Sequence, residues 1–324
     1  DKIRKTTGLV CSVEKAEQTC LGSWYNVTVG SVQSLQRESR LEKFRKDHFA
    51  NIIIDEAHHA ISDGYQRVLK HFKEANVLGV TATPDRGDMR NLGEYFDSLA
   101  YEYTLPKAIK EGYLSPIKAL TIPLKLDISQ VGVQAGDYAA GEIDTALDPY
   151  LEQIAAEMKK YCAARKTVVF LPLIKTSQKF TGILNRIGFH AAEVNGTSDD
   201  REEILKDFDE GKYNVLCNSM LLTEGWDCPS VDCVIILRPT KVRSLYSQMV
   251  GRGTRLYPQK KELLLIDFLW LTEKHELCHP AHLICEDKEV ADKLTENLEK
   301  VPGTGVDLQE AEQKASEDVI TQRE

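Results

Sequence analysis

The sequence has 324 residues, of which 42% are hydrophobic and 28% charged, with a formal net charge of −9 at pH 7. This length predicts about two domains of a soluble globular protein, and no apolar run is long enough to span a membrane. The acidic balance excludes a globally basic nucleic-acid-binding surface, so only local amides and a few basic groups could bind a polyanion. The eight cysteines include no Cys-x-x-Cys pair, which favours a reducing, cytoplasmic setting over a disulfide framework.

The first fifty residues predict strands over 6–13 and 26–30 and a charged surface helix over 37–48. Ser31 follows the second strand and can cap a short helix. A helix start with free amides and hydroxyls suits a phosphate group, and plain capping explains the same residues equally well.

The stretch from Asn51 to Ala60 is the centre of the first half. The isoleucine run 52–54 predicts a short buried parallel strand, which stops at Asp55 and Glu56. Ligands of open α/β sheets bind just past the carboxyl ends of strands. Two adjacent carboxylates there suit metal-assisted phosphoryl transfer, because one can hold Mg²⁺ through water and the other can activate an attacking water. An ordinary strand followed by solvated acids is the alternative.

A helix over 65–73 and a strand over 77–80 follow, and the strand ends in Thr81-Ala82-Thr83-Pro84. A hydroxyl-rich segment before a proline predicts a polar loop, and a simple turn is the alternative. The loop starts about one strand–helix–strand unit after Asp55, so we expect it beside the acidic pair in the sheet.

Residues 106–149 are rich in prolines and small residues, which predicts a linker region with a strand near 119–126. Strands and helices alternate again after it. Helices are predicted over 150–164, 177–187 and 199–210, and strands over 167–171, 190–194, 213–217 and 231–237. This pattern predicts a second doubly wound parallel sheet, with a cleft between the two domains. Amphipathic helices are predicted from about Cys285 onwards.

Two polar loops and one histidine–cysteine cluster stand out in this half. Residues 218–227 place hydroxyls, a glycine and an acid after a strand. Arg252 and Arg255 lie three positions apart, which predicts one helical face able to bind phosphate bidentately or, alternatively, a solvated basic face. Five further residues could supply zinc ligands, but Pro280 interrupts them and a helix-turn packing segment is favoured. They are His275, Cys278, His279, His282 and Cys285.

Taken together, these stretches resemble the superfamily 2 helicases and translocases of the DEAD/DEAH-box type, over residues 26 to about 256. The matching stretches, in family order, are Ser31–Leu35 (motif Ib), Asp55–His58 (motif II, Walker B), Thr81–Thr83 (motif III), Val168–Leu171 (motif IV), Thr223–Asp227 (motif V) and Gln248–Arg255 (motif VI). Each motif alone is weak to moderate, but their common order is specific. The sequences of motifs V and VI are similar to those of the bacterial and phage branch that is related to type III restriction subunits.

The resemblance implies an α/β fold with two RecA-like doubly wound parallel-sheet domains, the first incomplete. The implied parts are a partial first domain (1–105), a linker region (106–149), a second domain (150–275) and a C-terminal helical extension (276–324). No Gly-Lys-Thr or Gly-Lys-Ser phosphate loop is present, and Lys5-Thr6-Thr7-Gly8 lacks its glycine spacing. We therefore expect an N-terminally truncated fragment of a motor, or a natural remnant, with no appreciable ATP turnover of its own.

The resemblance also implies ATP and Mg²⁺ as cofactors and a role for each motif residue. Asp55 would hold the water shell of the magnesium ion, and Glu56 would polarise the hydrolytic water. Coupling of the nucleotide site to the strand-binding face falls to His58, Thr81 and Thr83. The residues that would bind the cofactor are Thr81, Thr83, Gln248 and, in the far wall of the site, Gly225 and Asp227. The fingers supplied in cis would be Arg252 and Arg255, and the phosphates of one nucleic-acid strand would be held by Ser31, Gln33, Ser219 and Thr223.

The implied function is ATP-dependent movement on nucleic acid, with DNA favoured over RNA, by a monomer that does not bind membranes. One alternative is a non-catalytic module that only holds nucleic acid. Another is the motor subunit of a restriction system, which would need a nuclease or methyltransferase partner.

Overall fold

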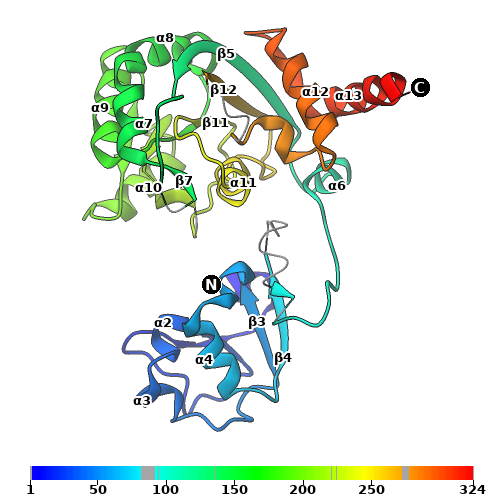
Figure 1. The fold of residues 1–324 in the computed structure, drawn as a ribbon. Helices are drawn as coiled ribbons and strands as arrows, with labels where there is room; N and C mark the ends of the chain where they lie inside the picture. The colour runs from blue at the N-terminus through cyan, green and yellow to red at the C-terminus, as the bar shows by residue number, and fades with distance from the viewer. Residues whose placement is uncertain are drawn as a thin grey trace. The chain divides into compact units, whose positions relative to one another are not determined.

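The structure, a computed structural model, describes residues 2–81, 92–93, 95–134, 136–219, 221–223, 225–271 and 277–323. The chain divides into two compact units, residues 1–101 and 102–324 (Figure 1). The first unit therefore ends shortly before residue 105, the predicted domain boundary. Each unit has its own hydrophobic clusters.

The first unit contains two small sheets, each made of two parallel strands. One pairs β1 (Cys11–Glu14) with β2 (Val27–Gly30), and the other pairs β3 (Asn51–Asp55) with β4 (Asn76–Val80). The helices of this unit include α1 (Lys2–Thr7), α2 (Val32–Leu35), α3 (Glu38–Leu41), the 3-10 helix η1 (Ala57–Ile61) and α4 (Asp63–His71). The strands predicted near 26–30, 52–54 and 77–80 and the helix predicted near 65–73 are all present.

Two predicted elements of the first unit are wrong in extent. Residues 2–7 are helical, so the strand predicted over 6–13 begins only at Cys11. The helix predicted over 37–48 covers only Glu38–Leu41. The chain turns after it and brings Phe44 and Phe49 onto Phe72, with ring centroids 6.2 and 5.1 Å from that of Phe72. A continued helix would point two residues five positions apart in different directions, so this packing favours the turn.

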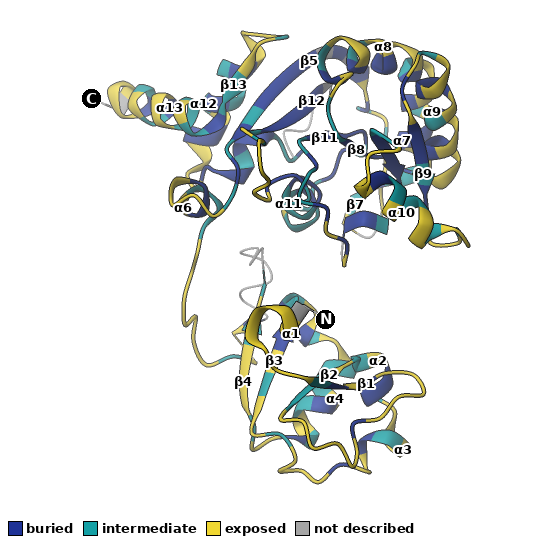
Figure 2. Cartoon of the chain, turned by 180° about the vertical axis from the view of Figure 1, so that it is seen from behind, coloured by how far each residue is buried: buried dark blue, intermediate teal, exposed yellow. Residues whose placement is uncertain are grey.

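Burial of the isoleucine strand β3 is one-sided. Ile54 is only 5% exposed and packs with Ala57 and Ala60 of η1, whereas Ile53 is 71% exposed. Among the described residues, the other face of this sheet carries exposed apolar side chains, and Figure 2 shows β4 as mostly exposed. The predicted parallel strand is confirmed, and its predicted burial is wrong for one face.

The second unit is built on a seven-stranded sheet in the order β13-β5-β12-β11-β8-β10-β9. Its strands are β5 (Ile117–Asp127), β8 (Thr167–Phe170), β9 (Ala191–Val194), β10 (Val215–Asn218), β11 (Cys233–Ile236), β12 (Leu263–Leu271) and β13 (Gly305–Asp307). All neighbours pair in parallel except β13, which runs antiparallel to β5. The prediction of an α/β protein with a parallel sheet in this half is confirmed.

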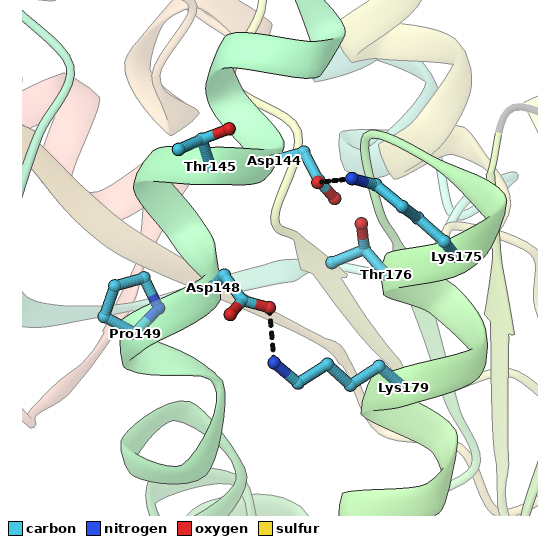
Figure 3. Close-up of a pocket in the computed structure, with 7 residues that line it drawn as sticks. All are labelled: Asp144, Thr145, Asp148, Pro149, Lys175, Thr176 and Lys179. Carbon is cyan, nitrogen blue, oxygen red and sulfur yellow. Dashed lines mark hydrogen bonds and ion pairs between the residues drawn. The ribbon is translucent and has the colours of Figure 1, made fainter.

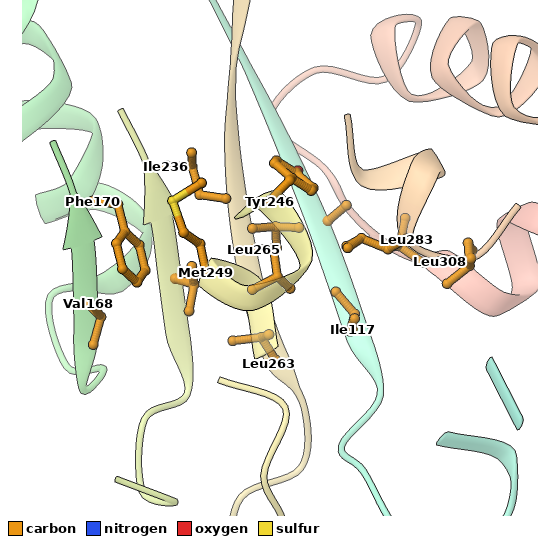
Figure 4. Packing of buried hydrophobic residues seen from close by; sticks show 14 of the residues in the cluster. Ile117, Val168, Phe170, Ile236, Tyr246, Met249, Leu263, Leu265, Leu283 and Leu308 are labelled. Carbon is orange, nitrogen blue, oxygen red and sulfur yellow. The ribbon is translucent and has the colours of Figure 1, made fainter. Parts of the chain in front are cut away.

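Apolar side chains are buried on both faces of this sheet. Val168 and Phe170 of β8 belong to one cluster, and Val169 and Leu171 belong to the other. Figure 4 shows the first cluster, in which Met249 lies among the strand residues. A run of four apolar residues is typical of a strand covered on both sides, which explains why the β8 sequence shows no alternation.

Helices connect the strands of the second unit. The α-helices are α6 (Leu105–Lys110), α7 (Ala140–Leu147), α8 (Leu151–Cys162), α9 (Ile174–Arg186), α10 (Arg201–Asp209), α11 (Arg243–Gly251), α12 (Lys288–Glu299) and α13 (Leu308–Arg323). The smaller elements are the strands β6 (Val133–Gln134) and β7 (Asp137–Tyr138) and the 3-10 helices η2 (Asp148–Tyr150), η3 (Leu221–Thr223) and η4 (Pro280–Leu283). Among the described residues, no helix combines the length and apolar character needed to cross a bilayer. All eight cysteines are free thiols.

Residues 106–149, read as a linker region from the sequence, form part of the second unit. The strand β5 lies between β12 and β13, and Ile117 pairs with Leu263. The register between β5 and β12 shifts after Phe268, along the stretch of β5 that contains Pro123. A proline cannot donate to the ladder, so an irregularity at this place is expected. Pairing with a distant strand therefore outweighs the local proline signal.

Residues 276–324, predicted as a helical extension, also pack into the second unit. The helices α12 and α13 are present, and Leu294, Leu308 and Val319 belong to the same cluster as the core of the sheet. Between these helices, β13 adds an edge strand to β5.

Candidate functional site

The predicted acidic pair lies beside Thr81, the first residue of the predicted hydroxyl loop, at the carboxyl end of the β3–β4 sheet. Asp55 lies opposite Val80 in the parallel register, so Thr81 follows β4 next to the acids, as predicted. His58 Nδ1 lies 3.3 Å from Thr81 Oγ1 and 3.4 Å from Glu56 Oε2. The histidine therefore connects the second acid to the loop that follows β4.

The backbone at this edge adopts an unusual conformation. Glu56 has φ 51° and ψ 54°, in the left-handed region that non-glycine residues seldom occupy, and its N–H donates to Asp55 Oδ1 at 3.0 Å. This turn leads from β3 directly into η1. A Cβ on Gly79 would lie 2.8 Å from Ala57 Cβ and 2.6 Å from Phe96 Cζ, so β4 can approach η1 only with glycine here.

The oxygen donors at this edge fit a magnesium ion held through water. Asp55 is exposed, and one of its carboxylate oxygens accepts the Glu56 amide. Magnesium is usually held by one or two carboxylates together with substrate phosphates and water, and this site offers such a carboxylate. The Glu56 side chain is 28% exposed, although its Oε2 is buried 3.4 Å from His58 Nδ1 and accepts no hydrogen bond from the described residues.

Ser31 and Gln33 lie together at the start of α2. Ser31 occupies the capping position, as predicted, but its hydroxyl donates to Gln33 Oε1 at 2.7 Å and caps no backbone amide. The N–H of Ser31 donates to the Glu14 carbonyl at 2.9 Å, which ties the start of α2 to the end of β1.

In the second unit, the arginines of motif VI contact the loop of motif V. The Arg252 guanidinium donates to the carbonyls of Thr223 and Trp226, the former at 2.5 Å. Arg255 Nε lies 3.5 Å from Asp227 Oδ1, and the Arg255 side chain is 56% exposed. The structure therefore brings together four of the predicted residues within this unit.

The prediction that Arg252 and Arg255 share one helical face is wrong. The helix α11 ends at Gly251, Arg252 is its C-cap and Arg255 lies in the turn beyond. A Cβ on Gly253 would lie 2.4 Å from Leu263 Cδ1, so the chain passes very close to β12 here. This close packing ends the helix.

The other predicted residues of the second unit lie on neighbouring elements. The Ser219 hydroxyl donates to the Pro172 carbonyl at 3.3 Å, which links the loops that follow β10 and β8. Gly225 has φ 70°, which requires a glycine-like conformation in the motif V loop. Gln248 is half-buried on α11, in the helix that ends at the arginine turn.

Two residues that the motifs do not include hold this arginine turn. Lys260 Nζ donates to the carbonyls of Gly253 and Arg255, the latter at 2.7 Å. The Ser115 hydroxyl donates to the Arg255 carbonyl at 3.0 Å, and the Ser115 N–H donates to the Thr254 carbonyl at 2.7 Å. Burial lowers the pKa of Lys260 from its ordinary value of 10.5 to about 8. In the sequence, Lys260 is one of two adjacent lysines and carries no signal of this role.

Thr83 and His275 lie outside the described residues. Within the described part of the chain, no three histidine, cysteine or acidic residues come together as a metal site. His279 and His282 instead form a capping box at η4, in which the His279 N–H donates to His282 Nδ1 at 2.9 Å. These contacts agree with a packing segment at residues 277–285.

A surface pocket of about 400 Å³ lies between α7 and α9 (Figure 3), and none of the predicted site residues lines it. Two ion pairs cross it, Lys175 Nζ to Asp144 Oδ2 and Lys179 Nζ to Asp148 Oδ1, each at 2.6 Å. Because each lysine already faces a carboxylate, these pairs join α9 to α7 and to η2 and leave no net charge for a ligand.

The two halves of the chain match two different protein families. Residues 8–86 match the family model described as type III restriction enzyme, res subunit. Residues 151–257 match the model described as helicase conserved C-terminal domain. The first match contains the acidic edge of β3, and the second contains the loops of motifs V and VI.

Individual relatives agree with these matches. IRC3 of Saccharomyces cerevisiae, named as an ATP-dependent helicase, is 30% identical over 307 residues, which cover 90% of this chain and 44% of IRC3. A fragment structure of an HsdR subunit of a type I restriction enzyme from Vibrio vulnificus is 26% identical, with a TM-score of 0.62, over 78% of this chain and 54% of that one.

The fold also resembles S. cerevisiae Dbp5 bound to RNA and ADP BeF3, with a TM-score of 0.57 and 16% identity over 97% of this chain and 75% of Dbp5. The chain thus spans less than half of IRC3 and just over half of the HsdR fragment. The order of the motifs, the acids at the end of β3 and the two family matches all lead to one conclusion. The chain belongs to the superfamily 2 helicases, with RecA-like domains of the type III restriction and helicase C-terminal types.

Proposed function

We propose that this chain is part of a motor that couples ATP hydrolysis to movement along nucleic acid, with DNA preferred over RNA. The observation that carries the proposal is the position of His58, within 3.4 Å of both Glu56 and Thr81. A carboxylate at a strand end suits water activation, and a histidine that contacts it can pass a change at the acid to the neighbouring loop.

The acidic edge would bind the nucleotide and its ion. When bound, Mg²⁺ and ATP supply the transferable phosphoryl group and the positive charge that activates it. Asp55 would hold the water shell of the ion through its exposed carboxylate. Glu56 would orient the attacking water and take its proton at its carboxylate. His58 and Thr81, with Thr83, would couple this step to the strand-binding face.

The second unit would complete the site after domain closure, which ties hydrolysis to movement. Gly225, Asp227 and Gln248 would form the far wall. Of the two proposed fingers, Arg255 is the more exposed, with its Nε 3.5 Å from Asp227 Oδ1, and we assign the finger role to it. Arg252 donates to two carbonyls of the motif V loop, so it would hold that loop against the end of α11.

The phosphates of ATP need a further element. None of the 324 residues forms a Gly-Lys-Thr or Gly-Lys-Ser loop, whose amides and lysine neutralise the β- and γ-phosphates. We propose that such a loop acts together with these residues in the working motor and that residues 1–324 alone hydrolyse ATP poorly.

Ser31, Gln33, Ser219 and Thr223 would hold phosphates of one nucleic-acid strand. A second candidate function is the motor subunit of a restriction system, with a nuclease or methyltransferase partner. The match to the HsdR fragment favours it, because that protein is a restriction subunit and is similar in both sequence and fold.

The test is nucleic-acid-stimulated ATPase activity of a protein that joins residues 1–324 to a phosphate loop. Glu56→Gln should lower turnover at least about hundredfold, because it removes the proton acceptor. Glu74→Gln, at an exposed acid of the same unit, is the matched control and should keep full activity. Single-stranded DNA should stimulate more than RNA of the same sequence. An active Glu56→Gln variant would contradict the proposed mechanism.

A further inference from the structure

The loop between β1 and β2 presents an unusually exposed tryptophan. Trp24 is 97% exposed, and its neighbours Tyr25 and Leu21 are 53% and 37% exposed. We infer that Trp24 is a stacking platform for an unpaired base of single-stranded nucleic acid, a contact outside the predicted motifs. This inference rests on the proposed function, because it adds a base contact to the strand that Ser31 and Gln33 would hold.

The loop is held at its base by a buried ion pair. Glu14 is completely buried, and its carboxylate accepts from the Cys20 N–H at 2.8 Å, the Thr19 hydroxyl at 2.9 Å and Arg40 Nε. The Arg40 guanidinium also donates to the carbonyls of residues 16 and 18. A buried carboxylate and guanidinium with several hydrogen bonds give a loop a defined geometry.

Local hydrogen bonds also hold the backbone at the tip of the loop. The Ser23 N–H donates to the Cys20 carbonyl at 3.0 Å, and the Tyr25 N–H donates to Ser23 Oγ at 3.2 Å. Gly22 has φ 82°, a conformation that favours glycine in a tight turn. A tryptophan held out on an ordered loop loses little conformational entropy when it binds, which favours a binding role.

The base of the loop is directly bonded to the candidate phosphate contacts. The Glu14 carbonyl accepts from the Ser31 N–H at 2.9 Å, and the Ala16 N–H donates to Ser34 Oγ at 2.9 Å. The strand end that anchors the loop is therefore the same one that positions Ser31. A nucleic-acid strand held at Ser31 and Gln33 would extend from this anchor.

The chemistry of the loop fits a base better than a protein surface. Stable protein interfaces need a broad apolar centre, whereas the exposed apolar side chains of this loop are only Leu21, Trp24 and Tyr25, next to polar residues such as Ser23. Lys15 and Glu17 balance in charge, so the loop itself does not repel phosphates. One indole face suits one base, and such stacking tolerates any sequence, which a motor requires.

The experiment uses the chain itself and two fluorescently labelled strands of about 20 nucleotides, oligothymidylate and an abasic strand of equal length. Binding is measured by anisotropy, and stacking is measured by the tryptophan emission of the protein. The variants are Trp24→Ser, Trp24→Phe and, as the matched control on the same loop, Leu21→Ser. The chain has two other tryptophans, Trp270 and Trp226, of which Trp226 is only 8% exposed. Trp24→Phe keeps both, so its emission measures their combined response to the ligand.

We expect the unmodified chain and Leu21→Ser to bind oligothymidylate about tenfold more tightly than the abasic strand. Trp24→Ser should bind both strands with the affinity that the unmodified chain has for the abasic strand. Trp24→Phe should keep most of the preference, because it keeps an aromatic face. Oligothymidylate should quench the emission of the unmodified chain but not that of Trp24→Phe.

Equal binding of the two strands by the unmodified chain, or a preference that survives in Trp24→Ser, would overturn the inference and leave the proposed function standing. If the chain bound neither strand, the proposed function would fail as well. If Trp24→Ser changed sedimentation but not oligothymidylate binding, Trp24 would be a contact between copies of the chain, and the inference would be wrong.

Discussion

Replacement of Lys260 by methionine tests whether a buried ammonium group holds the turn that carries Arg255. The change keeps the length of the side chain and removes the donor to the carbonyls of Gly253 and Arg255. Ser115 still donates to the Arg255 carbonyl at 3.0 Å, so the turn should loosen without unfolding. We therefore expect activity and stability to respond differently.

The change in the free energy of unfolding follows from two opposing contributions, the burial of the charge and the hydrogen bonds that it makes. Burial lowers the pKa of Lys260 from 10.5 to about 8, which at about 1.4 kcal/mol per pKa unit is roughly 3.5 kcal/mol against the charged form. We halve this to about 1.7 kcal/mol, because the side chain is partly open to water. The two lost hydrogen bonds cost about 1–3 kcal/mol together. The free energy of unfolding of Lys260→Met should therefore change by no more than about 1.5 kcal/mol, whereas kcat should fall about tenfold as Arg255 loses its orientation.

The pH dependence is a second test, because stability and turnover should change in opposite directions as the pH rises. Because the folded pKa of Lys260 is about 8 and the ordinary value is 10.5, the unfolded chain binds more protons between these pH values. The contribution of this group to stability therefore rises with pH across that window. Turnover should instead fall as the pH rises through about 8, because the ammonium group is lost. Lys260→Arg keeps its charge and should not show this fall.

The assays are urea unfolding and steady-state ATPase measurements between about pH 7 and pH 9, on the protein that includes a phosphate loop. A loss of more than about 3 kcal/mol in Lys260→Met would show that the lysine is mainly a structural residue. An unchanged kcat in the same variant would refute its role in positioning Arg255.

Three further predictions concern single residues. Gly253→Ala should lower the free energy of unfolding by about 1–3 kcal/mol in urea titrations, because its Cβ would lie 2.4 Å from Leu263 Cδ1; an unchanged midpoint would contradict this close packing. Arg255→Ala should lower single-turnover ATP hydrolysis about thousandfold with little change in nucleotide affinity, and a change in affinity alone would argue against a finger. Glu14→Ala should destabilise the first unit by about 3 kcal/mol in thermal melts, because Arg40 loses its partner; a silent variant would show that the pair is unimportant. Burial raises the pKa of Glu14, but the hydrogen bonds that its carboxylate accepts lower it further, so its contribution is present at neutral pH and is lost as the pH falls through the folded pKa.

Sequence patterns predicted the strand ends of the site because those signals are local. A β-branched run that stops at acids or hydroxyls marks both a strand and its ligand-binding end, and Asp55 and Thr81 do lie side by side. The same reasoning placed the strands and helices of residues 150–237 to within about three residues.

The features that sequence patterns missed depend on contacts between distant positions. Ser115 donates to a carbonyl 140 positions away, and no spacing rule predicts such a pair. The helix α11 ends where Gly253 packs against β12, so two arginines with helical spacing do not share a helix. The strand predicted near 119–126 is present as β5, but the linker reading of residues 106–149 missed that β5 pairs with residues 263–271 inside the second sheet.

The place of β5 in the sheet has a consequence for biosynthesis. This eleven-residue strand is made early, but its neighbours β12 and β13 leave the ribosome only with residues 263–271 and 305–307. Until then, both of its edges are open templates for pairing with other nascent chains. Slow translation of residues 263–307, or depletion of chaperones that shield extended segments, should therefore lower the yield of folded protein.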